Sequence, residues 1–336
     1  MNFAALSIAA FGVALGLHPP EAKRIGFDPI EALSEIRSLR ADAVLLPVPW
    51  STSTVEAGDL FRTEETIADD ALVATIRAAR SEGLDVALLP FVVVAHGADD
   101  AWRGVLRPRA PERWWSQYRA MILHYAALAE REHVALFAIG SELTSLQDDK
   151  RWAALARDVR RSYRGRIAYV ANHDALDRTA VFEHVDVAGV SAYFPLTTDI
   201  DADLDTLRAG WRDAERRIEQ LRREVERPVI VFEVGYPSID GAATRPWDDT
   251  LGAPIDLEEQ RRAYVAASEA LLSAPIEGAF FWTWFGPGGR HDRTFTPRHK
   301  PAEAVLRRFF TAATESRRPP PRPPRRRPRA ATRAPR

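Results

Sequence analysis

The chain has 336 residues, 46% of them hydrophobic, which is enough to bury the core of one large domain. It contains no cysteine, so disulfides, thiolate metal sites and cysteine nucleophiles are excluded. The formal net charge is −1, but residues 317–336 hold nine arginines and no acid; subtracting those nine charges leaves −10 for residues 1–316. An acidic body of this kind is not typical of a nucleic-acid-binding protein.

The N-terminal segment contains an apolar run, residues 3–17, of the length of a signal-peptide core. It lacks a basic start and a following A-x-A motif, and it is too short and glycine-rich for a membrane span. We therefore interpret FGVALGLH as the first buried strand. No later segment is long and apolar enough to cross a membrane. The sequence favours a cytoplasmic protein and leaves secretion open.

Short apolar runs that predict buried strands alternate along the chain with helical patterns. Strands are expected, in chain order, at 13–17, 43–48, 86–94, 136–140, 167–171, 187–191, 229–233 and 279–284. Helices are expected at 29–40, 69–82, 114–132, 150–163, 179–184, 206–225, 256–273 and 302–311.

This alternation predicts one (β/α)8 TIM barrel over residues 1–315. The strands read as continuous apolar runs, as expected when helices cover a parallel sheet. A doubly wound open sheet is the alternative, but GLHPP after the first strand is not its glycine-rich turn. Residues 316–336 form a Pro/Arg tail that we expect to be disordered.

Two glutamates follow apolar strands at the end of the barrel where chemistry is expected. Glu142 ends the fourth strand in FAIGSEL, and Glu233 ends the seventh in VIVFEVGYPS. Two carboxylates on one rim suit glycoside hydrolysis, in which one protonates the leaving oxygen and the other attacks the sugar or activates water. A solvated loop residue or a rim salt bridge is the alternative interpretation of each glutamate.

The nine tryptophans are numerous for this length and fall into two groups. Those on predicted helices are expected to pack in the core: Trp114, Trp115, Trp152 and Trp211. Those at strand ends or in the following loops are expected to offer flat apolar faces to sugar rings: Trp50, Trp102, Trp247, Trp282 and Trp284.

Polar residues at the same strand ends are further candidates for substrate binding, namely His96, Asn172 and His173. The histidines show no H-x-H or H-E-x-x-H pattern, so no metal site is expected. The acidic segment 199–205 lacks the glycine and the final glutamate of a calcium loop, and we interpret it as a solvated loop and helix cap.

Several motifs together resemble the family 113 glycoside hydrolases of the retaining clan A, and the resemblance covers most of residues 13–310. They are WRGVLRP, WWSQYRAMILHYAALAE, FAIGSEL, YVANHD, GVSAYFPL, FEVGYPS, FFWTWFGPGG and TPRHKPAEAVL. The family's characterised activity is endo-β-1,4-mannanase.

The resemblance implies that Glu142 is the acid/base, Glu233 the nucleophile and Tyr193 a hydrogen-bond donor to that nucleophile. It also implies that Trp282 forms the floor at the cleaved bond. Ser141 stands where many clan A enzymes have an asparagine that binds the sugar 2-hydroxyl, and we include it among the expected substrate contacts. We expect Glu142 to be the protonated carboxyl at rest and Glu233 the ionised one.

These observations predict a retaining β-glycosidase acting on a β-linked oligo- or polysaccharide, with β-1,4-mannan as the candidate substrate. The chemistry needs two carboxylates and water, so no cofactor is expected. Separately, we expect a monomer. The alternative is a catalytically inactive barrel that binds carbohydrate. A third interpretation gives the arginine-rich tail weak contacts with anionic surfaces.

Overall fold

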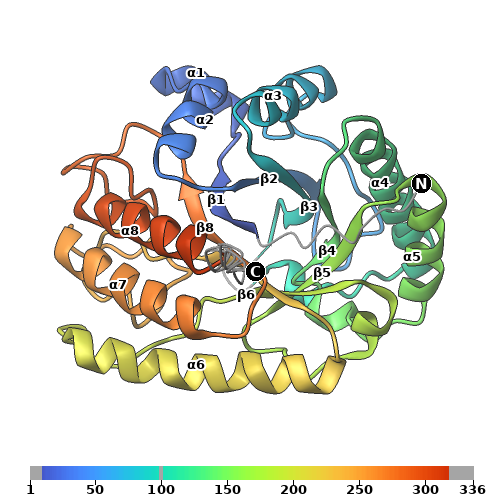
Figure 1. The fold of residues 1–336 in the computed structure, drawn as a ribbon. Helices are drawn as coiled ribbons and strands as arrows, with labels where there is room; N and C mark the ends of the chain where they lie inside the picture. Colours follow the sequence, from blue (N-terminus) through green and yellow to red (C-terminus); the bar gives the residue numbers. More distant parts are fainter. Residues whose placement is uncertain (1–9, 98–100, 318–336) are drawn as a thin grey trace, which may run out of the picture.

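The computed structural model describes residues 10–97 and 101–317. Within them, eight parallel strands close into a barrel in chain order, which confirms the predicted fold (Figure 1). The strands are β1 (Ala10–Leu15), β2 (Ala43–Thr52), β3 (Asp85–Val94), β4 (Leu136–Ser141), β5 (Arg166–Asn172), β6 (Val187–Ser191), β7 (Val229–Val234) and β8 (Gly278–Trp284).

The α-helices form a ring outside the barrel (Figure 1). They are α1 (Pro19–Ile25), α2 (Pro29–Ser38), α3 (Asp69–Ser81), α4 (Pro111–Arg131), α5 (Arg151–Ser162), α6 (Leu204–Val225), α7 (Leu257–Ser273) and α8 (Pro301–Ser316). Three short 3-10 helices, Arg103–Val105, Thr144–Leu146 and Ala180–His184, lie in the loops. Among the described residues, no helix has the length and apolar character needed to span a membrane.

The core has an inner and an outer compartment. Side chains from alternate strand positions fill the barrel interior, among them Leu45, Leu136, Ile230, Phe232 and Phe280. The opposite faces of the strands pack against the helices in a larger cluster. Because side chains fill the barrel, it is a packed core, and a ligand can enter only at its mouth.

The four tryptophans expected in the core are buried, as predicted. Trp114 stacks on Tyr118 with ring centroids 4.8 Å apart, and Trp115 meets Trp152 edge-on with centroids 5.0 Å apart. Trp211 is 1% exposed on α6. The segment 199–205 also behaves as predicted, since Asp203 caps α6 by accepting a hydrogen bond from the Thr206 N–H.

The structure differs from the sequence-based expectation at several elements, of which β1, α1 and α8 are examples. β1 begins at Ala10, because Ala10 and Phe11 already pair with β8. α1 was not predicted, since its Pro19–Pro20 start reads as a loop although proline is well tolerated in a first helical turn. α8 continues to Ser316, whereas the helix was expected to end at Thr311. Residues 1–9, which begin the apolar N-terminal run, and 318–336, most of the tail, lie outside the described residues.

Candidate active site

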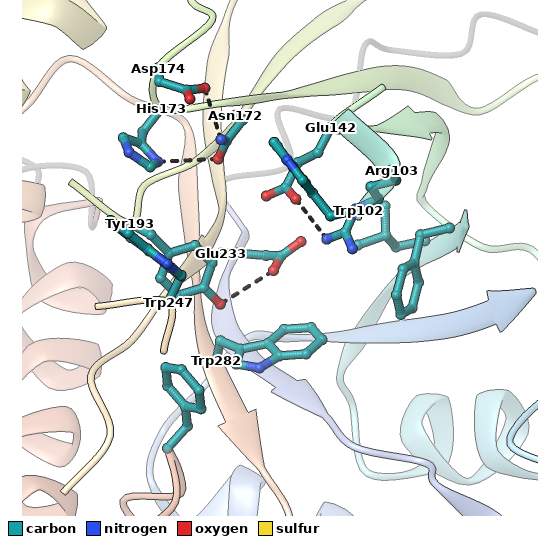
Figure 2. Close-up of a pocket in the computed structure, with 13 residues that line it drawn as sticks. Trp102, Arg103, Glu142, Asn172, His173, Asp174, Tyr193, Glu233, Trp247 and Trp282 are labelled. Carbon is teal, nitrogen blue, oxygen red and sulfur yellow. Dashed lines mark hydrogen bonds and ion pairs between the residues drawn. The ribbon is translucent and has the colours of Figure 1, made fainter. Parts of the chain in front are cut away.

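A cleft of about 610 Å³ opens at the C-terminal ends of the strands (Figure 2). Loops after β3, β4, β5, β6, β7 and β8 all contribute to it, so the barrel gathers residues from most of the chain. Its lining consists of Leu89, Phe91, Trp102, Arg103, Glu142, Asn172, His173, Asp174, Tyr193, Glu233, Trp247, Trp282 and Phe295.

Glu142 is the residue directly after β4, and its side chain lines the cleft. It is 5% exposed. Its backbone has a φ of 52°, a left-handed conformation that is uncommon for a residue with a side chain. The Glu142 N–H donates to the Val170 carbonyl on β5 at 2.8 Å, which holds this turn against the neighbouring strand. A Cβ on the preceding Gly140 would lie 2.7 Å from the Trp152 ring, so only glycine fits there.

Glu233 is turned into the cleft by an irregularity in the barrel wall. β6 and β7 pair Val190 with Val231 but Ser191 with Glu233, so β7 carries one extra residue at this point. Such a bulge changes the direction in which the following side chains point. Glu233 therefore faces the cleft although its neighbour Phe232 already fills the barrel interior, and it is 4% exposed.

Two contacts support this end of β7. The Tyr193 hydroxyl donates to Glu233 Oε2 at 3.3 Å. A Cβ on Gly235 would lie 2.2 Å from the backbone carbonyl oxygen of Trp282. Glycine therefore lets the chain directly after β7 pass close to the backbone of β8. The Glu233 carboxylate thus lies between a hydrogen-bond donor in the loop after β6 and Trp282 of β8 (Figure 2).

The electrostatics of the free protein differ from the expected assignment. Burial and the nearby Glu142 charge raise the pKa of Glu233 to about 7, against smaller lowering effects of Arg103 and the Tyr193 hydrogen bond. Burial, followed by the Glu233 charge, also raises the pKa of the Tyr193 hydroxyl well above its usual range, so it remains a donor. A raised pKa of Glu233 is the opposite of what we expected for the nucleophile.

Arg103, which the sequence analysis did not select, also lies beside these carboxyls and opposes the rise in the pKa of Glu233. Its Nη2 lies 2.7 Å from Glu142 Oε2, and the guanidinium also lies over the Phe91 ring, 5.2 Å from the ring centre. A cation this close favours the ionised form of a carboxylate. The only signal was its place in the WRGVLRP motif, beside Trp102.

Three of the five loop tryptophans lie in the cleft as predicted: Trp102, Trp247 and Trp282. Trp247 is 45% exposed and stacks on His173, with ring centres 5.7 Å apart and planes 21° from parallel. Asn172 donates from Nδ2 to Asp174 at 2.8 Å and contacts the His173 ring through Oδ1 at 3.1 Å. The end of β5, the residues after it and Trp247 from the β7–α7 loop form one polar and aromatic wall.

The other two loop tryptophans lie elsewhere, which corrects their expected role. Trp50 donates its indole N–H to the Tyr125 hydroxyl at 2.9 Å and borders a separate cleft of about 440 Å³ against α4. Trp284 is 2% exposed and donates to Glu35 on α2 at 3.2 Å. β1 residues 13–15 face β8 residues 281–284, so a bulge turns Trp284 outward although Trp282 faces the cleft.

Two polar candidates are also absent from the cleft lining. Ser141 is 1% exposed at the end of β4, so it is too deep to contact a ligand in this structure. His96 is exposed after β3, where its backbone N–H donates to the Ser53 carbonyl at 2.9 Å. Of the twelve predicted site residues, the structure therefore leaves out Trp50, His96, Ser141 and Trp284.

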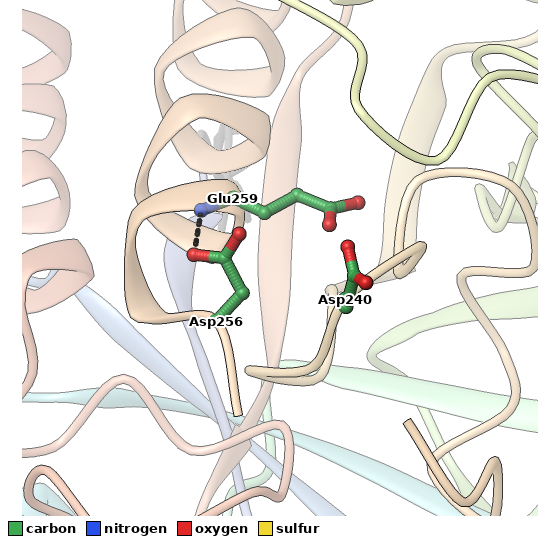
Figure 3. Close-up of side chains that lie close together, drawn as sticks. All are labelled: Asp240, Asp256 and Glu259. Atoms are coloured by element: carbon green, nitrogen blue, oxygen red, sulfur yellow. Dashed lines mark hydrogen bonds between the residues drawn. The ribbon is translucent and has the colours of Figure 1, made fainter. Parts of the chain in front are cut away.

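An acidic cluster secures the β7–α7 loop, which carries Trp247 (Figure 3). Carboxylate oxygens of Asp240, Asp256 and Glu259 lie within 4.8 Å of one another. Glu259 accepts from the Gly241 N–H at 2.7 Å and the Ala243 N–H at 2.9 Å, while Asp256 caps α7. Backbone N–H groups thus donate hydrogen bonds to two of the three carboxylates, those of Asp256 and Glu259. We therefore assign the cluster a structural role.

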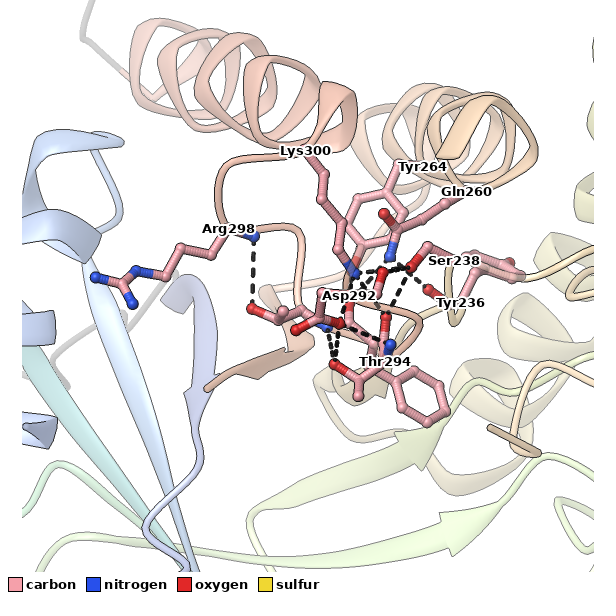
Figure 4. Close-up of polar contacts among 10 residues, drawn as sticks. Tyr236, Ser238, Gln260, Tyr264, Asp292, Thr294, Arg298 and Lys300 are labelled. Carbon is pink, nitrogen blue, oxygen red and sulfur yellow. Dashed lines mark hydrogen bonds and ion pairs between the residues drawn. The ribbon is translucent and has the colours of Figure 1, made fainter. Parts of the chain in front are cut away.

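A buried lysine connects this loop to the one after β8 (Figure 4). Lys300 Nζ donates to Ser238 Oγ at 2.8 Å, Asp292 Oδ1 at 3.0 Å and the Thr294 carbonyl at 2.9 Å. Burial lowers the pKa of Lys300 to about 8, against the opposing effect of Asp292. The network holds the chain beside Phe295, which lines the cleft and meets Tyr193 edge-on.

A (β/α)8 barrel with two buried carboxylates and three tryptophans at its C-terminal mouth has the design of a glycoside hydrolase.

The family model of Glycoside Hydrolase Family 113 matches residues 27–292. The GH113 β-mannanase AaManA from Alicyclobacillus acidocaldarius, solved with ManMIm, has a TM-score of 0.79 and 26% identity, over 90% of this chain and 97% of that one. Another GH113 β-1,4-mannanase structure has a TM-score of 0.78 and 23% identity, and the match covers 90% of this chain and 98% of that one. GH5_18 from Streptomyces cattleya, solved with GlcNAc, shares the fold with a TM-score of 0.61 and 17% identity. The match covers 94% of this chain and 83% of that one. The search of curated proteins found no match.

The chain therefore belongs to glycoside hydrolase family 113. It is an O-glycosyl hydrolase of the retaining clan A, as the sequence motifs predicted. Family membership favours this assignment over a catalytically inactive carbohydrate-binding barrel.

Proposed function

We propose that the protein hydrolyses a β-linked oligo- or polysaccharide, with β-1,4-mannan as the preferred candidate, by double displacement through Glu233 and Glu142. One observation carries the proposal: two buried carboxylates enter one cleft from the ends of different strands, and Trp282 also lines that cleft (Figure 2). A retaining mechanism needs one carboxylate on each side of the scissile bond, about 5–5.5 Å apart.

In the first step, the Glu233 carboxylate attacks the anomeric carbon as the bond to the leaving oxygen breaks. Glu142 donates its proton to that oxygen, which leaves as an alcohol, and an ester links the sugar to Glu233. In the second step, ionised Glu142 takes a proton from water, and the resulting oxygen nucleophile breaks the ester. Glu233 is released as a carboxylate, and the sugar keeps its original anomeric configuration.

The remaining residues that line the cleft supply orientation. Tyr193 donates to Glu233 and so stabilises the negative charge that the nucleophile regains in the second step. Trp282 offers an apolar face to the sugar at the cleaved bond, while Trp102 and Trp247 flank it from other loops. Asn172 and His173 present polar atoms at the β5 wall and are proposed to contact hydroxyl groups.

The choice of mannan rests on the relatives, because the AaManA structure and the second GH113 structure are both of β-mannanases. The cleft contains aromatic faces and two carboxylates, which suit a neutral sugar chain.

The test is to incubate the protein with β-1,4-mannan, β-1,4-glucan and β-1,4-galactan oligosaccharides and follow the products by proton NMR. We expect mannan to be cleaved fastest and the first product signal to be the β-anomer, before mutarotation. Glu142→Gln and Glu233→Gln should each lose activity, while Glu269→Gln on the outside of α7 should keep it. An initial α-anomer would contradict the mechanism, and faster cleavage of glucan or galactan would contradict the substrate.

A further inference from the structure

His173 lies between two aromatic rings, at the end of a short chain of hydrogen bonds (Figure 2). Its ring stacks on Trp247 and meets Phe194 edge-on, with ring centroids 5.7 Å and 5.5 Å away. Asn172, which is 8% exposed, donates from Nδ2 to Asp174 Oδ1 at 2.8 Å. Its Oδ1 lies 3.1 Å from His173 Nδ1. The aromatic neighbours hold the plane of the imidazole, and the amide holds the orientation of the ring within that plane.

The chemistry of these polar groups determines where the ring proton lies. A carboxylate only accepts hydrogen bonds, so the NH2 group of Asn172 faces Asp174 and its carbonyl oxygen faces the imidazole. A carbonyl oxygen also only accepts, so His173 Nδ1 carries a proton. Burial lowers the pKa of His173, against the opposing charges of Asp174 and Glu142, which favours the neutral ring at neutral pH. In that ring Nε2 has no proton and is a hydrogen-bond acceptor.

The Nε2 atom of His173 is available to a ligand. It makes no hydrogen bond with the described residues and is not fully enclosed by them, and the ring lines the cleft. A neutral acceptor beside aromatic rings suits an uncharged group that donates one hydrogen bond, as a sugar hydroxyl does. An ionised carboxylate or phosphate offers only acceptors and would face the Nε2 lone pair unfavourably.

His173 lies on the side of the cleft from which Glu142 comes. It follows β5, which is the neighbour of β4 and so of Glu142, whereas β6 separates β5 from β7 and Glu233. The effect of the Glu142 charge on the pKa of His173 also places these two groups near each other. In the proposed reaction Glu142 protonates the leaving oxygen, so a hydroxyl on this side belongs to the leaving-group sugar.

We propose that His173 is a substrate-binding residue whose Nε2 accepts a hydrogen bond from a hydroxyl of the leaving-group sugar. Asp174 is then a positioning residue, which sets the tautomer of His173 through Asn172. His173 itself transfers no proton. The inference rests on the proposed function, because it assigns the side of the cleaved bond on which His173 acts.

The first test is nitrogen-15 NMR of histidine-labelled protein at neutral pH, which distinguishes protonated from unprotonated ring nitrogens and needs no turnover. The His173 signals are assigned by their loss in His173→Phe. We expect a proton on Nδ1 and none on Nε2 in the wild type, and a mixture of both tautomers in Asp174→Leu, in which the Asn172 amide can turn. The control Asp177→Leu, exposed in the same loop and outside the cleft, should keep the wild-type pattern. A proton on Nε2 in the wild type, or an unchanged tautomer in Asp174→Leu, would overturn the proposal.

The second test compares a substrate whose leaving group is a sugar, β-1,4-mannotetraose, with one whose leaving group is fluoride, β-mannobiosyl fluoride. His173→Phe keeps an aromatic ring between Trp247 and Phe194 and removes the acceptor. We expect its kcat/KM to fall about three- to tenfold on mannotetraose, as for the loss of one hydrogen bond, and to change less than about twofold on the fluoride. Asp174→Leu should show the same selectivity with a smaller loss.

The kinetic outcomes separate this inference from the proposed function. Equal losses on both substrates in His173→Phe, or no loss on mannotetraose, would refute the role of His173 and leave the two-carboxylate mechanism intact. A wild type that turns over neither substrate would overturn the proposed function and, with it, the assignment of His173 to the leaving-group sugar.

Discussion

Replacing Glu233 by glutamine should stabilise the folded protein, because burial makes the ionised form of the Glu233 carboxyl unfavourable. The pKa of Glu233 is raised from its ordinary 4.5 to about 7, chiefly by desolvation and then by Glu142. Between these values the folded state binds more protons than the unfolded state, so stability falls as pH rises through that window. At about 1.4 kcal/mol per pKa unit, ionised Glu233 destabilises the fold by about 3 kcal/mol at about pH 8.

The assay is urea unfolding of wild type, Glu233→Gln and the control Glu269→Gln at about pH 8 and about pH 5. We expect Glu233→Gln to gain about 2–3 kcal/mol at the higher pH and less than about 1 kcal/mol at the lower one. Glu269 forms an exposed pair with Arg208, so its removal should change stability by less than about 1 kcal/mol. A Glu233→Gln gain that is equal at both pH values, or absent at the higher one, would refute the electrostatic reasoning.

Three further predictions follow from the cleft and its surroundings. Tyr193→Phe removes the donor to Glu233 and should lower kcat/KM by about 10- to 100-fold. It should also move the acidic limb of the pH profile of kcat/KM to higher pH. An unmoved acidic limb would show that the hydroxyl does not act on the nucleophile. Trp247→Ala should raise KM for mannotetraose by about three- to tenfold and leave kcat on a short aryl β-mannoside nearly unchanged; equal effects on both substrates would contradict a distant sugar contact. Removing residues 318–336 should leave hydrolysis of a soluble oligosaccharide unchanged, and lost activity would mean that the tail has a catalytic role.

The barrel and its two carboxylates were predictable from sequence because each depends on a local pattern. Apolar runs such as VIVF identify strands that helices cover, and the residue at the end of such a run reaches the barrel mouth. The glycines beside both glutamates have a structural reason, since added side chains at Gly140 and Gly235 would meet Trp152 and the Trp282 carbonyl.

What the sequence did not reveal depends on contacts between distant segments. Arg103 lies in a short 3-10 helix after β3, and its place in the site depends on its contact with Glu142, the residue after β4. Trp282 and Trp284 are two residues apart, yet a bulge in β8 sends one to the cleft and the other toward α2. Strand alternation predicts the same face for both, and no sequence pattern marks the extra residue.

The measurement that tests the central claim most directly is intact-protein mass spectrometry after exposure to an activated 2-deoxy-2-fluoro-β-mannoside. The account predicts a stable adduct of one fluorosugar, located on Glu233 by peptide mapping and absent from Glu233→Gln. Fluorosugars of other configurations, applied in parallel, would identify a different preferred sugar. An adduct on another residue, or none with any fluorosugar while mannan oligosaccharides are hydrolysed, would contradict Glu233 as the nucleophile.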